Sequence, residues 1–410
     1  MAMFGWGVGF YGPSIFLHAV VQRTGWSLTL VSTVVTVHYL FGALVITRLP
    51  SLHRRHGVGP TALVGSICAA VGVWGWSVAE LPWTLFLSAL LSGAGWVTMG
   101  AVAVNAAIAP WYLHQRPMAL AKAYNGASIG GLVFSPLWVL LIAQLGFPAS
   151  AGLVGLVMVG VMTLLSATVF TRTPEQLGQG PDGEGFGGAA PGMAPPQAQA
   201  LPGRLLWRNG RFLSLALGMA AGLFAQIGLL AHLFSVLVPA LGAQAAGLAM
   251  GFATACAIGG RMFVARLLPA GANRRLVAAL AYGVQLAGSI VLVFVDEQHI
   301  AWILLGVALF GSGIGNATSL PPLIAQAEFA KEDVPRVVAL TVAMAQASYA
   351  FAPAVFGFVL SATAEGGAHL GMNTSAFLLT VAAVQVIAIL SFLAKAVAAS
   401  VAACSESRCR

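Results

Sequence analysis

The chain alternates long apolar runs with short polar connections. A helix needs about 20 mostly apolar residues to cross the hydrocarbon core of a bilayer, and runs of that length recur along the whole sequence. They predict twelve membrane-spanning helices, six before and six after a long polar segment. The expected spans are 3–22, 27–47, 60–79, 83–109, 118–145, 148–170, 211–238, 244–266, 274–295, 299–325, 335–362 and 372–398.

The composition supports the same interpretation. Charged residues make up 7% of the 410 positions, against about 25% in an ordinary soluble domain. Apolar residues make up 59%, and there are 49 glycines. A lipid-facing surface needs no charges, and small residues let membrane helices pack closely. We therefore expect an all-α membrane protein with 12 transmembrane helices, arranged as two pseudo-symmetric six-helix bundles.

The basic residues fall almost entirely on one side of this layout. When both chain ends are placed in the cytoplasm, only Arg23 lies in an outward connection. The other 18 of the 19 Lys and Arg residues lie at or near the cytoplasmic face, as the positive-inside rule requires. The net charge of +8 is thus a signal of topology and does not indicate nucleic acid as a partner. We expect a multi-pass protein of the inner (cytoplasmic) membrane with both termini cytoplasmic.

A segment rich in Gly, Pro, Ala and Gln separates the two groups of six. Its composition is typical of a flexible linker. The predicted domains are an N-terminal six-helix bundle (1–172), a cytoplasmic linker (173–209), a C-terminal six-helix bundle (210–398) and a cytoplasmic tail (399–410). No basic segment precedes the first apolar run, so no cleavable signal peptide is expected.

The two groups of six also match in sequence. The pattern Arg-x-x-Ala-Leu-x-x-Ala-x-x-x-Ala-Ser begins at Arg116 and again at Arg336, an offset of 220 residues. A second match relates the basic residues after the second span to those after the eighth: Arg48, Arg54 and Arg55 align with Arg266, Arg274 and Arg275. Because both matches fall at equivalent places in the layout, we infer that the halves are copies of one six-helix unit.

Two parallel six-helix repeats joined by a cytoplasmic linker resemble the major facilitator superfamily over the whole chain. The resemblance implies a transporter whose halves rock about a substrate site near the middle of the membrane. The segment Arg48–Gly57 is similar to the signature after the second helix of that family, but it lacks the usual Asp.

Short motifs narrow the resemblance to one branch. Phe10–Phe16, followed by Gly25-Trp26-Ser27, and Tyr124–Pro136 in the fifth span resemble the monocarboxylate porters and oxalate–formate antiporters. The resemblance implies a secondary active or facilitated transporter of a small organic anion, with a monocarboxylate as the expected substrate.

One ionisable side chain stands out inside a span. Arg261 lies five residues before Arg266, about 7.5 Å deeper in the membrane at 1.5 Å per residue. The aligned residue of the first half is Ala43, so the repeat does not require a cation there. A charge inside the bilayer costs at least a few kcal/mol and therefore marks a candidate functional residue.

Two interpretations of Arg261 stay open. Its guanidinium can bind a carboxylate through two parallel hydrogen bonds, and the resemblance implies this role, because an arginine of this helix binds carboxylate in that branch. Alternatively, its head group reaches the membrane surface or holds helix ends together.

The chain also departs from that branch. The branch often carries an Asp one turn before the arginine, where this chain has Ala257, and a Lys on the first helix, where this chain has none. The oxalate exchangers carry a Lys on the eleventh helix, where Gln346 stands. A single cation suits a monoanion better than a dianion, so a dicarboxylate is disfavoured.

Coupling to protons lacks its usual residue. Proton coupling normally uses a buried Asp or Glu, and none lies in the middle of an expected span. Histidines titrate near neutral pH, so His18, His38 and His232 are the candidate proton carriers, although a histidine in a helix is more often an interhelical hydrogen-bonding residue. Facilitated transport without a proton stays open.

Six further polar or amphipathic residues in the spans are candidates for lining the substrate cavity: Tyr11, Asn125, Gln226, Asn316, Gln346 and Tyr349. Each can serve instead in hydrogen bonding between helices. No cluster of catalytic residues at one depth and no metal-ligand spacing is present, so an enzyme, a metal site and a cofactor are not expected. The expected partners are a small organic anion, the lipid bilayer and protons, and the expected state is a monomer. The competing function is an exporter of drugs or other amphiphilic small molecules, which often has an acidic residue in the first half.

Overall fold

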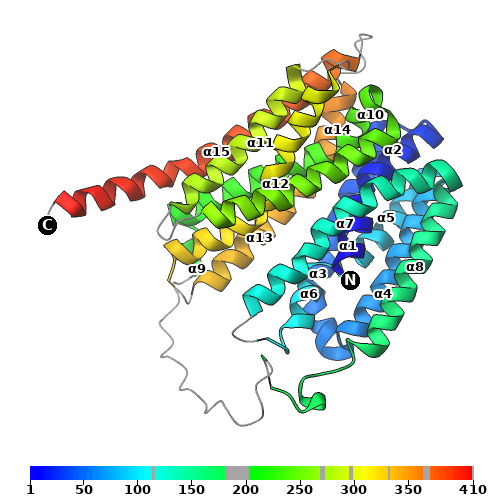
Figure 1. The fold of residues 1–410 in the computed structure, drawn as a ribbon, viewed down its shortest axis with the longest axis horizontal. Helices are drawn as coiled ribbons and strands as arrows, with labels where there is room; N and C mark the ends of the chain where they lie inside the picture. The colour runs from blue at the N-terminus through cyan, green and yellow to red at the C-terminus, as the bar shows by residue number, and fades with distance from the viewer. Residues whose placement is uncertain are drawn as a thin grey trace. The chain divides into compact units, whose positions relative to one another are not determined.

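The computed structural model describes residues 1–112, 116–180, 182, 203–267, 273–294, 299–330, 333–362 and 370–408. Every regular element in these ranges is a helix (Figure 1). The all-helical membrane fold predicted from the sequence is confirmed. The chain divides into two compact units, the first of residues 1–193 and 233–251 and the second of residues 194–232 and 252–410.

The apolar helices match the predicted number of spans. In the described ranges, eleven helices are long and apolar enough to cross a membrane. One of them belongs to α10 (Gly210–Leu267), whose 58 residues would measure about 87 Å, nearly three times a hydrocarbon core of about 30 Å. The backbone of α10 is not helical at Gly242, where φ is 75° and ψ is 162°, a conformation that glycine adopts readily. Divided at Gly242, α10 supplies the seventh and eighth spans, and the total is twelve.

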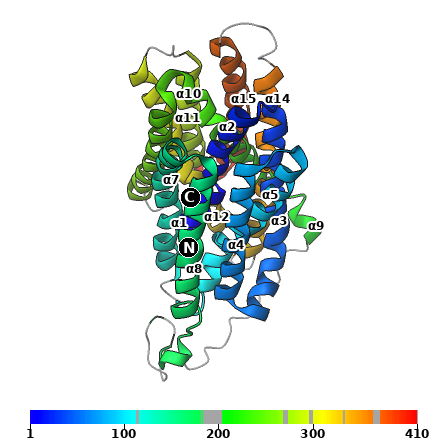
Figure 2. The same cartoon turned by 90° about the vertical axis from the view of Figure 1, so that its right-hand side faces the viewer.

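Among the described residues, the first unit contains eight α-helices, the short 3₁₀ helix η1 (Glu175–Leu177) and a part of α10. The eight are α1 (Ala2–Gly9), α2 (Gly12–Thr24), α3 (Leu28–His56), α4 (Val58–Val78), α5 (Pro82–Val97), α6 (Ala101–Ile108), α7 (Arg116–Leu145) and α8 (Phe147–Thr168). Helix α4 packs against α5 and α8, and α1 packs against α7; α4 and α8 lie side by side in both views (Figures 1 and 2). The segment Leu233–Gly251 of α10 belongs to this unit.

The described part of the second unit contains the rest of α10 and six further helices. These are α9 (Gly203–Leu206), α11 (Arg274–Phe294), α12 (Ile300–Glu328), α13 (Val334–Tyr349), α14 (Ala352–Ala362) and α15 (Leu370–Arg408). Helix α11 packs against both α12 and α15. Phe212 of α10, Tyr282 of α11 and Phe392 of α15 lie in the apolar core of the second unit. Burial of these large aromatic side chains holds the three helices together.

Three spans that the sequence predicted as continuous are interrupted. The first is divided into α1 and α2, the fourth into α5 and α6, and the eleventh into α13 and α14. Pro13 and Pro353 lie at the start of the helices that follow the first and third interruptions. Proline has no backbone N–H and clashes with the preceding turn. A run of apolar residues reports length and burial but not local backbone dihedrals, which is why the spans were predicted without breaks.

Two predicted helix ends were too early. Helix α3 continues to His56, nine residues past the expected end at 47, so the expected loop 48–57 shrinks to Gly57. Four basic residues occupy the last turn of α3, where cations interact favourably with the negative end of the helix dipole. Helix α15 continues to Arg408 through the expected tail, because the alanines of this segment favour a helix.

Of the predicted linker 173–209, only residues 173–180, 182 and 203–209 lie in the described ranges. They form the short helices η1 (Glu175–Leu177) and α9.

Arg23, the basic residue that the layout places outside, has a structural explanation. Its Nη2 donates to the carbonyl of Ala79 at 2.8 Å and to that of Trp76 at 3.4 Å. These carbonyls lie at the C-terminal end of α4, where the helix has no partners of its own for them. Arg23 therefore caps α4 and does not contradict the predicted orientation.

Candidate functional site

The interruption of the first span is stabilised by side chains of α3. Pro13 cannot donate a hydrogen bond to the carbonyl of Gly9 four residues earlier. His38 Nε2 lies 2.9 Å from that carbonyl oxygen, and the Tyr39 hydroxyl donates to the carbonyl of Phe10 at 2.9 Å. A broken membrane helix is tolerated only where its freed backbone groups find such partners. The neighbouring residues His38 and Tyr39 supply them.

Both ring nitrogens of His38 have hydrogen-bond partners. Because a carbonyl oxygen only accepts, Nε2 carries a hydrogen. Nδ1 lies 2.8 Å from the Ser92 hydroxyl oxygen, which also accepts from the Trp76 indole at 3.2 Å. His38 is 1% exposed, so this predicted proton carrier is enclosed among its structural partners.

An aromatic cluster surrounds the same interruption. The ring of Phe10 contacts Tyr11, Tyr39 and Trp96, with centroids 5.1, 6.3 and 6.3 Å away. The predicted cavity residue Tyr11 is buried here. Tyr39 and Trp96 were not singled out by the sequence, because no spacing links residues that α3, α5 and the break between α1 and α2 bring together.

His18 differs from the other candidate histidines in its exposure. It lies in α2 and is half-buried, whereas His38 and His232 are almost fully buried. Its Nδ1 lies 3.2 Å from the Ser235 hydroxyl, and its ring meets Phe234 edge-on with centroids 5.1 Å apart. Both partners belong to the segment Leu233–Gly251 of the first unit. This contact joins a helix of the first sequence repeat to one of the second.

His232 takes a place in the second unit that parallels that of His38. Its Nε2 donates to the carbonyl of Pro353 at 3.0 Å, beside the interruption between α13 and α14. The ring is 0% exposed and packs edge-on against Phe377. Nδ1 is buried and has no hydrogen-bond partner among the described residues. Each of these two histidines therefore binds a backbone carbonyl next to a broken helix.

Arg261 lies at the crossing of α10 and α12. It is half-buried, and its Nε donates to the carbonyl of Gly315 at 3.1 Å. A Cβ added to Gly315 would lie 2.3 Å from the Ala257 carbonyl oxygen, so only glycine permits the two backbones to approach this closely. The hydrogen bond fixes the guanidinium at the crossing while the side chain stays partly accessible.

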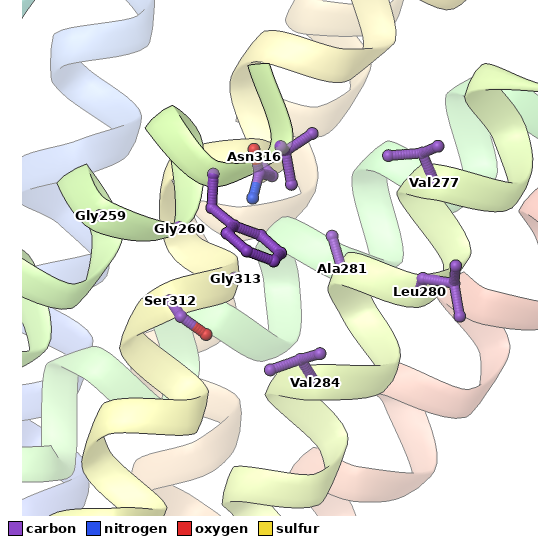
Figure 3. Close-up of a pocket in the computed structure, with 11 residues that line it drawn as sticks. Gly259, Gly260, Val277, Leu280, Ala281, Val284, Ser312, Gly313 and Asn316 are labelled. Carbon is purple, nitrogen blue, oxygen red and sulfur yellow. The ribbon is translucent and has the colours of Figure 1, made fainter. Parts of the chain in front are cut away.

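Asn316 follows Gly315 directly and is 3% exposed. It lines a groove of about 600 Å³ between α10, α11 and α12 (Figure 3). The structure therefore brings two predicted site residues, Arg261 and Asn316, to the same helix crossing.

Gln226 is hydrogen-bonded to a residue that the sequence analysis missed. The Gln285 amide donates to Gln226 Oε1 at 3.2 Å, and the two side chains are 0% and 3% exposed. Gln226 and Gln285 carry the same sequence signal for a candidate site residue, since each is an amide side chain in an apolar span. This contact fits the interhelical alternative considered for Gln226.

The remaining candidates lie apart from these contacts. Gln346 and Tyr349 are half-buried at the end of α13, where the Gln346 carbonyl accepts from the N–H of Ala350 at 3.1 Å. Asn125 is exposed on α7. Its neighbour Tyr124 makes the polar contact instead, with Asn105 donating to the Tyr124 hydroxyl at 2.6 Å.

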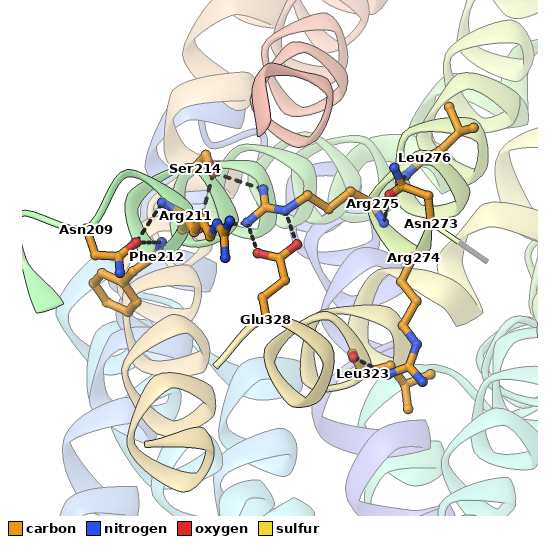
Figure 4. A network of polar contacts seen from close by, with 10 residues as sticks. All are labelled: Asn209, Arg211, Phe212, Ser214, Asn273, Arg274, Arg275, Leu276, Leu323 and Glu328. Carbon is orange, nitrogen blue, oxygen red and sulfur yellow. Dashed lines mark hydrogen bonds and ion pairs between the residues drawn. The ribbon is translucent and has the colours of Figure 1, made fainter. Parts of the chain in front are cut away.

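A buried ion pair holds three helices of the second unit at one end (Figure 4). The Arg275 side chain is 2% exposed and binds the Glu328 carboxylate through Nε and Nη2. Its other donors reach the Ser214 hydroxyl at 2.9 Å and the Arg211 carbonyl at 2.8 Å. The network links the beginnings of α10 and α11 to the end of α12. Four of the five N–H donors of this buried guanidinium are thereby engaged, and the carboxylate neutralises its charge.

Comparison with known proteins places the chain in a family. A family model described as the Major Facilitator Superfamily matches residues 1–353. No curated protein matches the chain in sequence.

Solved structures agree in fold. A mutant form of the nucleoside transporter NupG is 12% identical, with a TM-score of 0.68 over 96% of this chain and 98% of that one. A bacterial homologue of the human lysosomal transporter Spinster, inward-facing and unoccupied, is 14% identical, with a TM-score of 0.62 over 97% of this chain and 94% of that one. At these identities the likeness shows the fold alone.

Removing the His38 ring tests its role at the broken helix. His38→Ala leaves the Gly9 carbonyl buried without a donor, which costs about 1–3 kcal/mol, so we expect a lower melting temperature in detergent. Adding Pro13→Ala restores a backbone N–H that can bond to the same carbonyl. The double variant should therefore melt above His38→Ala. Equal melting temperatures for His38→Ala and its Pro13→Ala derivative would show that the carbonyl is not what His38 stabilises.

Proposed function

Because the chain belongs to the Major Facilitator Superfamily, we propose that it transports a small organic anion, a monocarboxylate in the first instance, by alternating access. Membership of this family makes it a membrane transporter rather than an enzyme. The substrate class is supported by Arg261, a half-buried arginine held at the crossing of α10 and α12. An anion that enters the membrane region must exchange its hydration for a fixed cation.

The geometry at Arg261 supports an anionic substrate. Its Nε donates to the Gly315 carbonyl, which holds the guanidinium at the crossing of α10 and α12 while the side chain stays half-buried. A planar guanidinium can bind a carboxylate through two parallel hydrogen bonds.

Substitution of Arg261 tests the proposal. We expect Arg261→Ala to lower lactate, pyruvate or formate counterflow in proteoliposomes by at least about tenfold, since losing one partner of a desolvated charge pair costs about 2–5 kcal/mol. Arg261→Lys keeps the charge but not the planar two-donor geometry. Its counterflow should therefore lie between that of the unaltered protein and that of Arg261→Ala. Arg208→Ala, at an exposed arginine of the same unit, is the matched control. Normal counterflow by both Arg261 variants would remove Arg261 from the site, and counterflow of hydrophobic cations in place of the anions would favour the exporter alternative.

We also propose His18 as the proton carrier. Of the three histidines inside spans, it alone is half-buried, whereas His38 and His232 are 1% and 0% exposed. A hydroxyl can donate to neutral imidazole or accept from imidazolium, so the Ser235 contact suits both protonation states. His38 and His232 are instead enclosed in the fold, where their rings donate to the Gly9 and Pro353 carbonyls.

The proton carrier is tested by the pH change that accompanies substrate entry into vesicles. His18→Gln should abolish the substrate-induced pH change while substrate exchange, which needs no net proton movement, continues. His56→Gln, at an exposed helix end, should leave the pH change intact. If the unaltered protein moves substrate without any pH change, proton symport is excluded.

The orientation rests on 18 of 19 basic residues at one face, from which we propose an inner-membrane protein with both termini cytoplasmic. Reporter fusions to each end are expected to report the cytoplasm, and fusions that place the two ends on opposite faces would contradict the twelve-span layout.

A further inference from the structure

The groove beside Asn316 opens away from the helix bundle. Its floor is α12, where Ser312 and Asn316 are the polar lining residues, and its walls are α10 and α11 (Figure 3). The wall residues Phe263 and Leu280 are 64% and 61% exposed. In a membrane-spanning segment such apolar exposure faces lipid hydrocarbon, so the groove is open to the bilayer.

Two arginines mark one end of this groove. Arg266 lies three residues after Phe263 on α10, and Arg274 lies three residues before Val277 on α11. Residues three apart share a helix face, so both arginines continue the walls of the groove. Arg266 is exposed, and Arg274 donates one hydrogen bond to the Leu323 carbonyl. Neither forms an ion pair with a described residue.

The depth of the groove corresponds to one leaflet. From Arg274 to the innermost wall residue of α11, Val284, there are ten residues, or about 15 Å at 1.5 Å per residue. From Arg266 to Gly259 on α10 there are seven residues, or about 10 Å. Half of a hydrocarbon core is about 15 Å. A groove of this depth holds one acyl chain while the head group stays at the membrane surface.

We propose that this groove binds an anionic phospholipid, with an acyl chain between α10 and α11 and the phosphate between Arg266 and Arg274. The apolar walls bury methylene groups, and the two guanidinium groups supply donors and charge for the phosphate. A zwitterionic lipid would leave a cationic head group beside two arginines. The head-group charge therefore decides which lipid occupies the groove.

Native mass spectrometry of the full chain in detergent tests the proposal, with dioleoyl phosphatidylglycerol and dioleoyl phosphatidylcholine as the two probes. We expect the first to bind at least about tenfold more tightly, since each arginine near a membrane surface contributes roughly fivefold. Arg266→Gln together with Arg274→Gln should remove this preference. Arg266→Gln alone, at an exposed helix end, should lower the ratio of the two lipid affinities by about fivefold. Val284→Trp, which fills the groove, should weaken the binding of both lipids.

The repeat supplies the control. Arg48 and Arg54 are the aligned arginines of the first half, and both are exposed. Arg48→Gln together with Arg54→Gln removes the same charge and should keep the preference for phosphatidylglycerol. Equal affinity of the unaltered chain for both lipids would overturn the proposal that the ligand is an anionic lipid. If the preference for phosphatidylglycerol is lost in the double Arg48 and Arg54 variant but kept in the double Arg266 and Arg274 variant, the proposed position of the phosphate is overturned. Full lipid binding by Val284→Trp would overturn the groove as the site of the acyl chain.

Discussion

The requirement that every backbone polar group find a partner within the membrane governs this structure. Continuous helices meet it by themselves, but the first and eleventh spans are interrupted next to Pro13 and Pro353. A histidine side chain donates to a carbonyl beside each interruption: His38 to the Gly9 carbonyl that Pro13 leaves without its usual donor, and His232 to the Pro353 carbonyl in the first turn of α14. These two residues, which resemble titratable switches in the sequence, are committed to backbone carbonyls because hydrocarbon offers no water to replace them.

A buried charge needs a partner as well, and this requirement shows how the two repeats have diverged. Arg55 and Arg275 are aligned, and their side chains have opposite environments, since Arg55 is exposed and Arg275 is 2% exposed. Glu328 makes the burial of Arg275 possible by binding it with two carboxylate oxygens. The position 220 residues earlier is Ile108, so the first half has no equivalent acid there. One carboxylate thus converts a surface arginine into a connection among three helices.

The crossing of α10 and α12 joins the proposed transport function to the proposed lipid site. Gly315 allows these helices to touch, which orients Arg261 through the Gly315 carbonyl and places Asn316 on the floor of the neighbouring groove. A lipid between α10 and α11 would contact the helix that carries Arg261. Since α10 also contributes the segment Leu233–Gly251 to the first unit, it is the one helical element described here that belongs to both units.

The sequence by itself determined the number of spans, the two groups of six spans and the family. The lengths of the apolar runs and the spacing of the repeat can both be read directly along the chain, without knowledge of which helices meet. It also marked Arg261, since a lone cation in an apolar run is conspicuous. Only the tertiary structure decided which polar residues are structural. The roles of His38, His232 and Arg275 depend on a carbonyl or a carboxylate supplied by another helix 29, 121 and 53 residues away. Likewise, the interruptions of the spans and the groove beside Asn316 follow from how neighbouring helices meet, which hydrophobicity along one chain does not encode.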